Sequence, residues 1–258
     1  MPEGDTIHYL ASRIRLVLAG HVPDAIATPH PRFGRDRWPE RLAGRTVTSV
    51  DAHGKHLFLR FEGDLVIHSH LGMSGIWGVY GPGRRWGRSA RRAWLVLASG
   101  GHEVVEFDGP LLELITDGRR RFDQRLSALG PDVLAERFDF EVFLRRMRAD
   151  DPTRTFGDAL LDQRNVAGIG NIWKAEGCWE AAIDPWRPVS TVTAAEAIAV
   201  IEAVRPRMAQ SAVDGPRSIR ARVYRRVGQP CPRCGAPIRA HGQGDANRTT
   251  YWCEGCQC

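Results

Sequence analysis

Residues 160–176 read Leu-Leu-Asp-Gln-Arg-Asn-Val-Ala-Gly-Ile-Gly-Asn-Ile-Trp-Lys-Ala-Glu, and this stretch decides how the middle of the chain folds. Gly168 and Gly170 break one helix and allow a tight turn into the next, with Asn171 at the start of that second helix. The first N–H groups of a helix lack partners within it, so they favour an anion such as phosphate. The alternative for Asn171 is a plain N-cap, and the two roles are compatible.

Helical patterns continue on both sides of this stretch. Residues 140–147 place three apolar side chains on one helical face, and residues 159–161 begin another helical stretch. Thr193-Ala-Ala-Glu196 is a capping-box pattern ahead of an apolar run. Pro206 should end or kink that helix, because proline lacks the N–H and its ring clashes with the preceding turn. Residues 132 to about 212 are therefore predicted to be helical.

Residues 1 to about 130 are predicted to be mostly β structure after an initial helix, whose apolar residues run at helical spacing from Ile7 to Leu18. Strand-like runs follow at Thr46–Asp51, His56–Phe61, Leu65–His70 and Trp94–Ala98. Gly100-Gly101 is a typical hairpin turn between the last of these runs and Glu103-Val-Val-Glu-Phe. Many short strands with turn residues between them indicate a sandwich or a barrel.

The cysteines gather at the C-terminal end, where Cys231-Pro-Arg-Cys234 and Cys253-Glu-Gly-Cys256 are separated by 18 residues. Paired C-x-x-C motifs at this spacing are typical of a tetrahedral Cys₄ zinc site, and the stretch between them suits a short β-hairpin. Redox chemistry would need a single C-x-x-C in a thioredoxin-like context, which is missing. Four thiolates leave no open position on the metal, so we expect a structural zinc ion. Cys258, at the end of the chain, is expected to be spare.

Composition limits the class of protein. The 258 residues carry a net charge of +6, with 43% hydrophobic and 26% charged residues, which is ordinary for a globular protein with a real core. No apolar run approaches the ~20 residues of a membrane span. The first residues lack the basic and apolar regions of a signal peptide. We therefore expect a cytoplasmic protein with no membrane partner.

The basic residues are unusual in kind. Only two of the 36 are lysines, Lys55 and Lys174. Codon bias toward arginine explains the background, yet a lysine that remains is informative, because its compact, mobile ammonium cannot be copied by arginine. The excess positive charge by itself is weak evidence for an anionic partner.

The N-terminus offers a possible nucleophile. Removal of Met1 would leave Pro2 with a free secondary amine, and α-amines have pKa values near 7.7–8.0, so a useful neutral fraction exists at pH 7. Such an amine can attack an electrophilic carbon and form an iminium, while the adjacent Glu3 donates or accepts a proton. The alternative is that Pro-Glu merely opens a helix.

Three motifs in order resemble one family. Pro2-Glu3-Gly4, Gly-Ile-Gly-Asn171-Ile and the C-terminal cysteine hairpin are together similar to the formamidopyrimidine-DNA glycosylase / endonuclease VIII family of base-excision repair enzymes. The resemblance implies an α+β fold: an N-terminal β-sandwich catalytic domain at 1–131, a helix–two-turn–helix domain at 132–219 and a zinc-finger β-hairpin at 220–258. It covers nearly the whole chain.

The resemblance also implies catalytic roles. Pro2 corresponds to the nucleophile that attacks C1′ of the damaged nucleotide and forms the Schiff base, and Glu3 to the acid that protonates the sugar ring oxygen. Lys55 matches a β-strand lysine that contacts DNA phosphate and assists β-elimination; an exposed strand lysine is the alternative. Arg248 matches the zinc-finger arginine on the phosphates beside the lesion, linked to δ-elimination, and a solvated surface arginine is its alternative.

Further DNA contacts follow from the same resemblance. Asn171 matches the asparagine that grips phosphate beside the lesion, and Glu176 a carboxylate that approaches the N-terminal amine. A base stacked in duplex DNA must be extruded before chemistry, and the gap must be filled. Met73 resembles the residue that enters the vacated stack, while Arg120 and Phe122 resemble a further arginine and an aromatic wedge. The alternative is that Met73 and Phe122 are core residues.

The implied function is a monomeric, bifunctional DNA glycosylase/AP lyase that acts on damaged double-stranded DNA, forms a Schiff base and leaves a one-nucleotide gap by β,δ-elimination. Thr6 stands where the family often has a carboxylate, whose role is then absent or moved to Asp5. The short stretch from Met208 to Val223 favours oxidised pyrimidines, whereas the segments of Met73 and Phe122 favour oxidised purines. Two alternatives are a non-catalytic binder of damaged DNA and a zinc-ribbon adaptor for protein partners.

Overall fold

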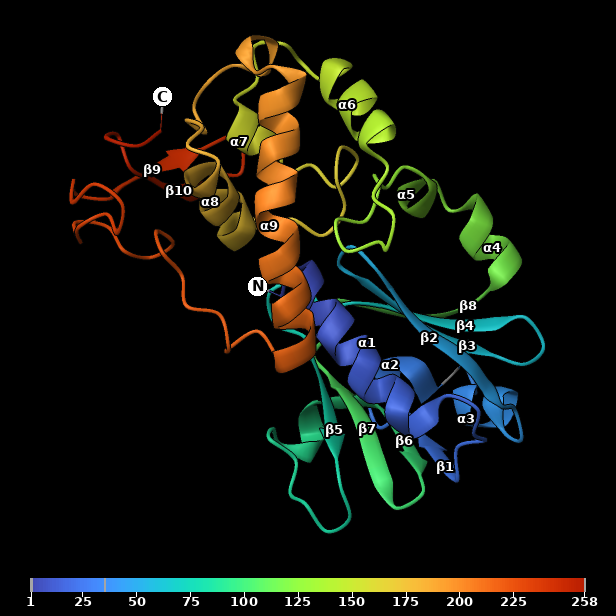
Figure 1. The fold of residues 1–258 in the computed structure, drawn as a ribbon. Helices are drawn as coiled ribbons and strands as arrows, with labels where there is room; N and C mark the ends of the chain where they lie inside the picture. The colour runs from blue at the N-terminus through green and yellow to red at the C-terminus, as the bar shows by residue number, and fades with distance from the viewer. Residues whose placement is uncertain (1, 35, 258) are drawn as a thin grey trace. The chain divides into compact units, whose positions relative to one another are not determined.

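The computed structural model describes residues 2–34 and 36–257 (Figure 1). The chain divides into two compact units. The first consists of the first two residues with Thr6–Ser127, and the second of Glu3–Asp5 with Ala128–Cys258. The predicted boundaries of three domains, at 131 and 219, stay a prediction.

The first unit is a β-sandwich of two four-stranded antiparallel sheets. One sheet has the order β2 (Val47–His53), β3 (His56–Phe61), β4 (Leu65–His70), β8 (Leu111–Thr116). The other has the order β1 (Ala25–Ala27), β6 (Ala93–Ser99), β7 (His102–Phe107), β5 (Ile76–Tyr80). Of the two architectures that the strand pattern allowed, the sandwich is the one observed, and the predicted fold class is confirmed.

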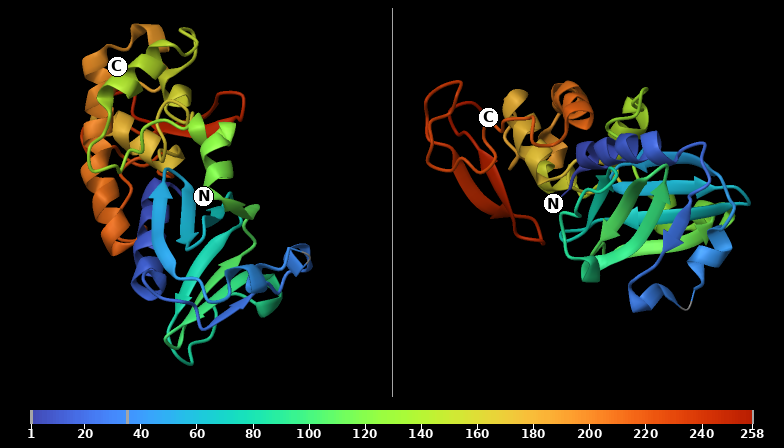
Figure 2. Two further views of the ribbon diagram at one scale, coloured as in Figure 1. Left: turned by 90° about the vertical axis from the view of Figure 1, so that its right-hand side faces the viewer. Right: turned by 90° about the horizontal axis from the view of Figure 1, so that it is seen from below.

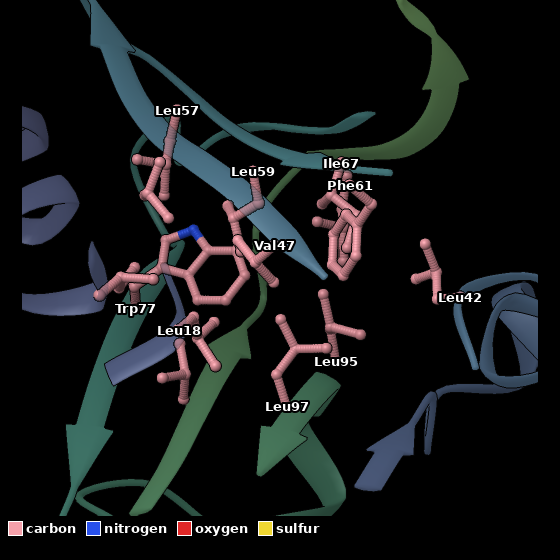
Figure 3. Close-up of a cluster of buried hydrophobic side chains, with 14 of the residues drawn as sticks. Leu18, Leu42, Val47, Leu57, Leu59, Phe61, Ile67, Trp77, Leu95 and Leu97 are labelled. Carbon is pink, nitrogen blue, oxygen red and sulfur yellow. The ribbon is translucent and has the colours of Figure 1, made fainter. Parts of the chain in front are cut away.

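The core of the sandwich lies between the two sheets. Leu57, Leu59 and Ile67 of the first sheet meet Leu95 and Leu97 of the second, and all five are fully buried (Figure 3). The helix α1 (Gly4–Leu18) contributes further apolar side chains to the same cluster from its buried face. Alternation of side chains along each strand produces this arrangement, since residues two apart share one face.

The predicted strands are found, and three more accompany them. The runs at His56–Phe61 and Leu65–His70 match β3 and β4 residue for residue. Gly100 and Gly101 have φ of 55° and 74°, as a two-residue turn of this hairpin class requires. The strands β1, β5 and β8 were not anticipated. The remaining short helices of this unit are α2 (Pro31–Gly34), α3 (Trp38–Leu42), the 3₁₀ turn η1 (Ala90–Arg92), α4 (Asp117–Phe122) and α5 (Gln124–Ser127).

The second unit is helical, with a terminal β-hairpin. Its elements are α6 (Phe140–Arg148), α7 (Phe156–Ala159), α8 (Asn171–Glu180), the 3₁₀ turn η2 (Val189–Thr191), α9 (Ala194–Asp214), β9 (Arg239–Gln243) and β10 (Arg248–Trp252). The helices share one apolar core, while α8 and the residues that flank the hairpin share a second. Figure 2 draws the ribbon of this unit, with the C-terminal segment in red. No helix of the described ranges is both long and apolar enough to cross a membrane.

Two features of α9 test the sequence predictions. The capping box is present, with Thr193 Oγ1 accepting from Glu196 N at 3.2 Å and Glu196 Oε2 accepting from Thr193 N at 2.7 Å. The helix does not end at Pro206, so that part of the prediction is wrong. Proline removes one helical hydrogen bond, but Val204 and Met208 on either side are buried, and their packing keeps the two segments together.

Candidate functional site

Glu3 occupies the anion site at the start of α8. Its Oε1 accepts from Ile172 N at 2.7 Å, and its Oε2 accepts from Gly170 N and Trp173 N at 3.0 and 3.2 Å. The carboxylate is 2% exposed. A Cβ at Gly170 would lie 2.4 Å from Glu3 Cδ, so only glycine leaves room for this side chain. These N–H groups therefore do hold an anion, as expected at a helix start, but the anion is a carboxylate of the chain itself and not a phosphate.

The segment before α1 is fixed by the same contacts. Gly4 N donates to Gly168 O at 2.8 Å, and α1 begins at Gly4, so Pro2 and Glu3 precede the helix rather than form its first turn. The half-buried Pro2 is thus one peptide bond away from an anchored carboxylate. Met1 lies outside the described residues, so its removal stays a prediction.

Asn171 is the first residue of α8, and Gly170 is the N-cap, so the alternative that Asn171 is a plain N-cap is wrong. Its Nδ2 donates to Thr249 O at 2.7 Å. Its Oδ1 is buried and has no hydrogen-bond partner within residues 2–34 and 36–257. The amide nitrogen carries two hydrogens, and one of them remains for another acceptor.

Arg248 begins β10 and is exposed. It pairs with Gln243 across the hairpin, directly before the Thr249 carbonyl that Asn171 contacts. Asn171 on α8 therefore bonds the residue next to Arg248 on β10, so the structure brings these two predicted phosphate contacts close together.

Lys55 lies in the two-residue turn at residues 54–55 between β2 and β3, not on a strand as predicted. Gly54 has a φ of 56°, which explains why the strand turns there. Lys55 is 7% exposed, so the alternative of an exposed strand lysine is wrong. Burial lowers the pKa of His70, and the Lys55 ammonium lowers it further, which places Lys55 near the His70 ring.

A row of histidines beside Lys55 escaped the sequence analysis. His56 Nδ1 and His68 Nε2 are 2.8 Å apart, and His68 Nδ1 lies 2.8 Å from Glu113 Oε1. The carboxylate fixes the proton of His68 on Nδ1, so His56 donates to His68. Burial lowers the pKa of His56 to about 2, and that ring is neutral. The sequence feature that could have predicted this row is the alternation of His68 and His70, with His56 on the preceding strand-like run.

Met73 and Phe122 are exposed, 78% and 87% respectively, so the alternative that they are core residues is wrong. Met73 lies in the turn between β4 and β5, and Phe122 is the last residue of α4. Arg120 is less available, because its Nε donates to Asp117 at 2.6 Å and its guanidinium lies 6.0 Å from the centre of the Phe58 ring. The hydrogen bond from Arg120 is the main reason that the pKa of Asp117 is lowered.

Glu176 is buried and holds neighbouring segments of its own unit together, and the role at the DNA site that the resemblance implied stays a prediction. Its Oε1 accepts from the backbone N–H groups of residues 222, 223 and 224 at 3.0, 2.9 and 3.1 Å. Its Oε2 accepts from Arg207 Nη1 at 3.0 Å. These donors occupy both oxygens, so this buried carboxylate joins α8 to α9 and to the segment that follows it. Asp5 is likewise engaged, since Ser211 Oγ donates to its carboxylate at 2.5 Å.

Cys231, Cys234, Cys253 and Cys256 form a cluster that fits a metal ion, with all sulfurs within 4.8 Å of one another. Two of the sulfur pairs are 3.7 and 3.5 Å apart, and thiolates about 2.3 Å from a tetrahedral zinc stand about 3.8 Å apart. The Trp179 indole N–H donates to Cys231 Sγ at 3.3 Å.

The two remaining cysteines lie outside this cluster. Cys178 is in the helical core, where burial raises its pKa to about 12 and keeps it inert. Cys258, which was expected to be spare, lies outside the described residues.

Two family models match the chain: the formamidopyrimidine-DNA glycosylase N-terminal domain over residues 1–124, and the formamidopyrimidine-DNA glycosylase H2TH domain over residues 129–222. Together with curated relatives over the whole chain, they show that the chain belongs to the formamidopyrimidine-DNA glycosylase / endonuclease VIII family. The family that the three motifs indicated is confirmed.

The relatives narrow this class. A probable endonuclease 8 2 of Streptomyces coelicolor is 41% identical, with all of this chain and 94% of the relative covered. A DNA-(apurinic or apyrimidinic site) lyase Nei2 of Mycolicibacterium smegmatis is 33% identical over 100% and 99% of the two chains. Among solved structures, the Lactococcus lactis formamidopyrimidine-DNA glycosylase bound to DNA with an AP site has a TM-score of 0.83 at 23% identity, with 99% of each chain covered. That likeness shows the shared fold.

Proposed function

We propose that this DNA glycosylase and AP lyase of base excision repair uses Pro2 as its nucleophile, favours oxidised pyrimidines and cleaves the strand by β,δ-elimination. The observation that carries the proposal is Glu3, a buried carboxylate held by three backbone N–H groups, directly after Pro2. Such rigid support is what a group next to a reacting amine needs, because small displacements of reacting atoms are costly.

The chemistry follows from a secondary amine beside a carboxylate. The Pro2 nitrogen attacks C1′ and a bond forms between them, while the bond from C1′ to the damaged base breaks. The base leaves with that electron pair and takes a proton from water. The proton that the attacking nitrogen loses passes through Glu3 to the sugar ring oxygen, which opens the ring and leaves an iminium. Three N–H donors fix the position of the Glu3 carboxylate, so it can relay that proton without rearranging.

Strand cleavage follows from the iminium. It withdraws electrons from C1′, so a C2′ proton becomes acidic; its loss expels the 3′-phosphate in β-elimination. A second elimination then expels the 5′-phosphate, which leaves the one-nucleotide gap. Water hydrolyses the iminium, which frees the sugar fragment and the Pro2 amine. Lys55 assists the first elimination, and Arg248 the second.

We assign the DNA contacts mainly to side chains that are exposed or that retain a hydrogen-bond donor. The second hydrogen of Asn171 Nδ2 donates to a phosphate beside the lesion, and the exposed Arg248 pairs with the neighbouring phosphate. Met73 and Phe122 fill the space of the extruded nucleotide, since exposed apolar side chains of this size are suited to enter a base stack. Arg120, held by Asp117, completes this set. The net charge of +6 agrees with a DNA partner.

The four cysteines would hold one zinc ion. Four thiolates would close its coordination shell, so the ion would stabilise the fold and take no part in the reaction. Its function here is to fix the hairpin that carries Arg248. We further propose that the chain acts as a monomer on double-stranded DNA of the bacterial cytoplasm, since its relatives are bacterial.

The preference for oxidised pyrimidines rests on a short connection. The helix α9 ends at Asp214, and Glu176 already holds the backbone at Arg222, so only residues 215–221 lie between. Such a connection leaves little chain to cover an extruded purine. Cleavage of duplexes with thymine glycol or dihydrouracil should exceed cleavage of 8-oxoguanine duplexes. The reverse order would assign the purine substrates that the Met73 and Phe122 segments favour.

Borohydride trapping tests the nucleophile. Protein whose intact mass shows loss of Met1 should form a covalent adduct with abasic-site DNA, and Pro2→Gly should abolish the adduct. Glu3→Gln should lose base-excision activity, while the exposed Glu40→Gln serves as a matched control. Full activity in protein that retains Met1 would exclude the Pro2 amine, and salt-dependent binding without cleavage would favour a non-catalytic binder.

A further inference from the structure

Lys174 is one of two lysines in the chain, and the proposed reaction does not use it. It lies in the first turn of α8 and is fully buried. Its Nζ donates to Gln243 Oε1 at 3.1 Å and to Thr250 Oγ1 at 2.5 Å. Both acceptors belong to the hairpin β9–β10 and are themselves buried.

The acceptors form a closed network. Thr250 Oγ1 donates to Gln243 Oε1 at 2.7 Å, and Gln243 Nε2 donates to Pro185 O at 2.8 Å. Neither acceptor is charged, so the ammonium is buried without a carboxylate bonded to it. Burial lowers the pKa of Lys174 to about 8, and the nearby Arg248 lowers it further, against the opposing effects of Cys178, Asp158 and Glu3. Such a group costs stability relative to an apolar side chain of the same size.

The network lies directly behind Arg248. Gln243 is the cross-strand partner of Arg248, and Thr250 is two residues further along β10. Between them, the Thr249 carbonyl accepts from Asn171, one helical turn before Lys174. Two side chains of α8 at i and i+3 therefore hold the first residues of β10, and residues so spaced lie on one face of a helix.

We propose that Lys174 is a positioning residue, which fixes the hairpin β9–β10 on α8 and thereby sets where Arg248 stands beside Asn171. The inference rests on the proposed roles of Arg248 and Asn171 at the DNA phosphates. It predicts that Lys174 affects DNA binding and the second elimination through Arg248, and leaves the attack by Pro2 unchanged.

Lysine suits this position better than its substitutes. A guanidinium would bring five donors in a rigid fork to a place that offers two acceptors. Methionine fills a similar volume without donors, and Thr250 and Gln243 would still bond to each other. Lys174→Met is therefore expected to fold, and to loosen the position of the hairpin on α8 by removing two hydrogen bonds.

The experiment is a double-mutant cycle of Lys174→Met and Arg248→Ala on the full chain loaded with zinc. Binding is measured by fluorescence anisotropy on a duplex with a tetrahydrofuran abasic analogue, and the ratio of δ- to β-elimination products on an abasic-site duplex. The matched control pairs Lys174→Met with Arg239→Ala, because Arg239 is an exposed arginine of the same hairpin that pairs with Glu254. Metal content and thermal unfolding verify each variant.

Lys174→Met should weaken binding about tenfold and lower the δ-product fraction when Arg248 is present, and change binding less than about twofold when Arg248 is alanine. With Arg239→Ala the losses should add. Borohydride trapping at saturating DNA should stay within about twofold of the parent. Equal losses with and without Arg248, or no loss at all, would overturn the proposal.

Two arms keep the outcomes separate. If Lys174→Met does not fold, Thr250→Val removes one of the two acceptors of Lys174 from the hairpin side and enters the same cycle. If the parent protein gives no borohydride adduct, the Pro2 mechanism fails, while the binding cycle still decides whether Lys174 acts through Arg248.

Discussion

Two buried carboxylates, Glu176 beside α8 and Glu106 on β7, show how differently the two units of this protein treat a buried acid. Glu176 is 1% exposed and accepts from three backbone N–H groups and from Arg207. Glu106 is 0% exposed, and neither of its oxygens has a hydrogen-bond partner in the part of the chain that the structure describes. Burial chiefly raises the pKa of Glu106 to about 8. Burial without donors thus disfavours the ionised form of Glu106, whereas Glu176 is buried among four hydrogen-bond donors.

The first prediction concerns Glu176, the carboxylate that is surrounded by donors. Glu176→Gln places an amide among N–H donors and leaves Arg207 without its carboxylate, so we expect a loss of about 3–5 kcal/mol in the free energy of unfolding. Urea denaturation measures it. Glu180→Gln is the matched control one turn later, since Glu180 forms a partly exposed ion pair with Arg222 at 3.3 Å. That control should lose less than about 1 kcal/mol, and equal losses would contradict the comparison.

The second prediction concerns Glu106, whose pKa is about 8 in the folded protein against a reference value of 4.5. Between these two values the folded state binds more protons than the unfolded state, so stability falls as pH rises and levels off above about 8. Glu106→Gln resembles the protonated acid in shape and cannot ionise. It should match the parent near pH 4.5 and exceed it by about 4 kcal/mol near pH 8.5.

Parallel denaturation curves of both proteins measure this difference, because the other titrating groups cancel in the comparison. A constant difference across the pH range would show that Glu106 stays ionised in the fold. Gly109 is part of the explanation, since a Cβ there would lie 1.9 Å from Glu106 Oε1. Gly109→Ala is therefore expected to disturb this site.

The third prediction has the smallest expected change in the free energy of unfolding. It concerns Glu3, whose three donors all lie at one helix end. Glu3→Gln should lower the free energy of unfolding by about 1–2 kcal/mol, the usual range for a charged helix cap. Thermal unfolding measures the loss. Asp139→Ala removes an ordinary cap, in which Asp139 accepts from Val142 N at 2.8 Å, and should cost about 1 kcal/mol without affecting excision. A larger effect of Asp139 on excision than of Glu3 would contradict the proposed chemistry.

Local patterns made much of the fold predictable. The hydrophobic spacing of α1, the runs of β3 and β4, the glycine turn at 100–101 and the capping box of α9 are each encoded within a few residues. The strands β1, β5 and β8 were missed for a physical reason. One has three residues, another contains Gly78, and all depend on pairing with distant strands.

The same distinction between local patterns and long-range contacts applies to the candidate site. Pro2, the cysteine pairs and the glycine-rich stretch were visible as motifs. The bond between Glu3 and α8 was not, because it joins residues 167 positions apart at Gly170. The partners of Glu176 and the burial of Lys174 were hidden for the same reason. Sequence motifs thus identified the candidate side chains, but only the structure shows which hydrogen-bond partners each of them has.

The indole of Trp179 touches the cysteine cluster through Cys231, and the Arg233 guanidinium lies 4.4 Å from its ring centre. Indole fluorescence is sensitive to a neighbouring thiolate and to a stacked cation. We therefore expect the fluorescence of Trp179 to change when the four cysteines bind a metal ion. The chain has eight tryptophans, and a difference spectrum against Trp179→Phe isolates this one. Metal exchange can then be followed in real time, without a label and without DNA.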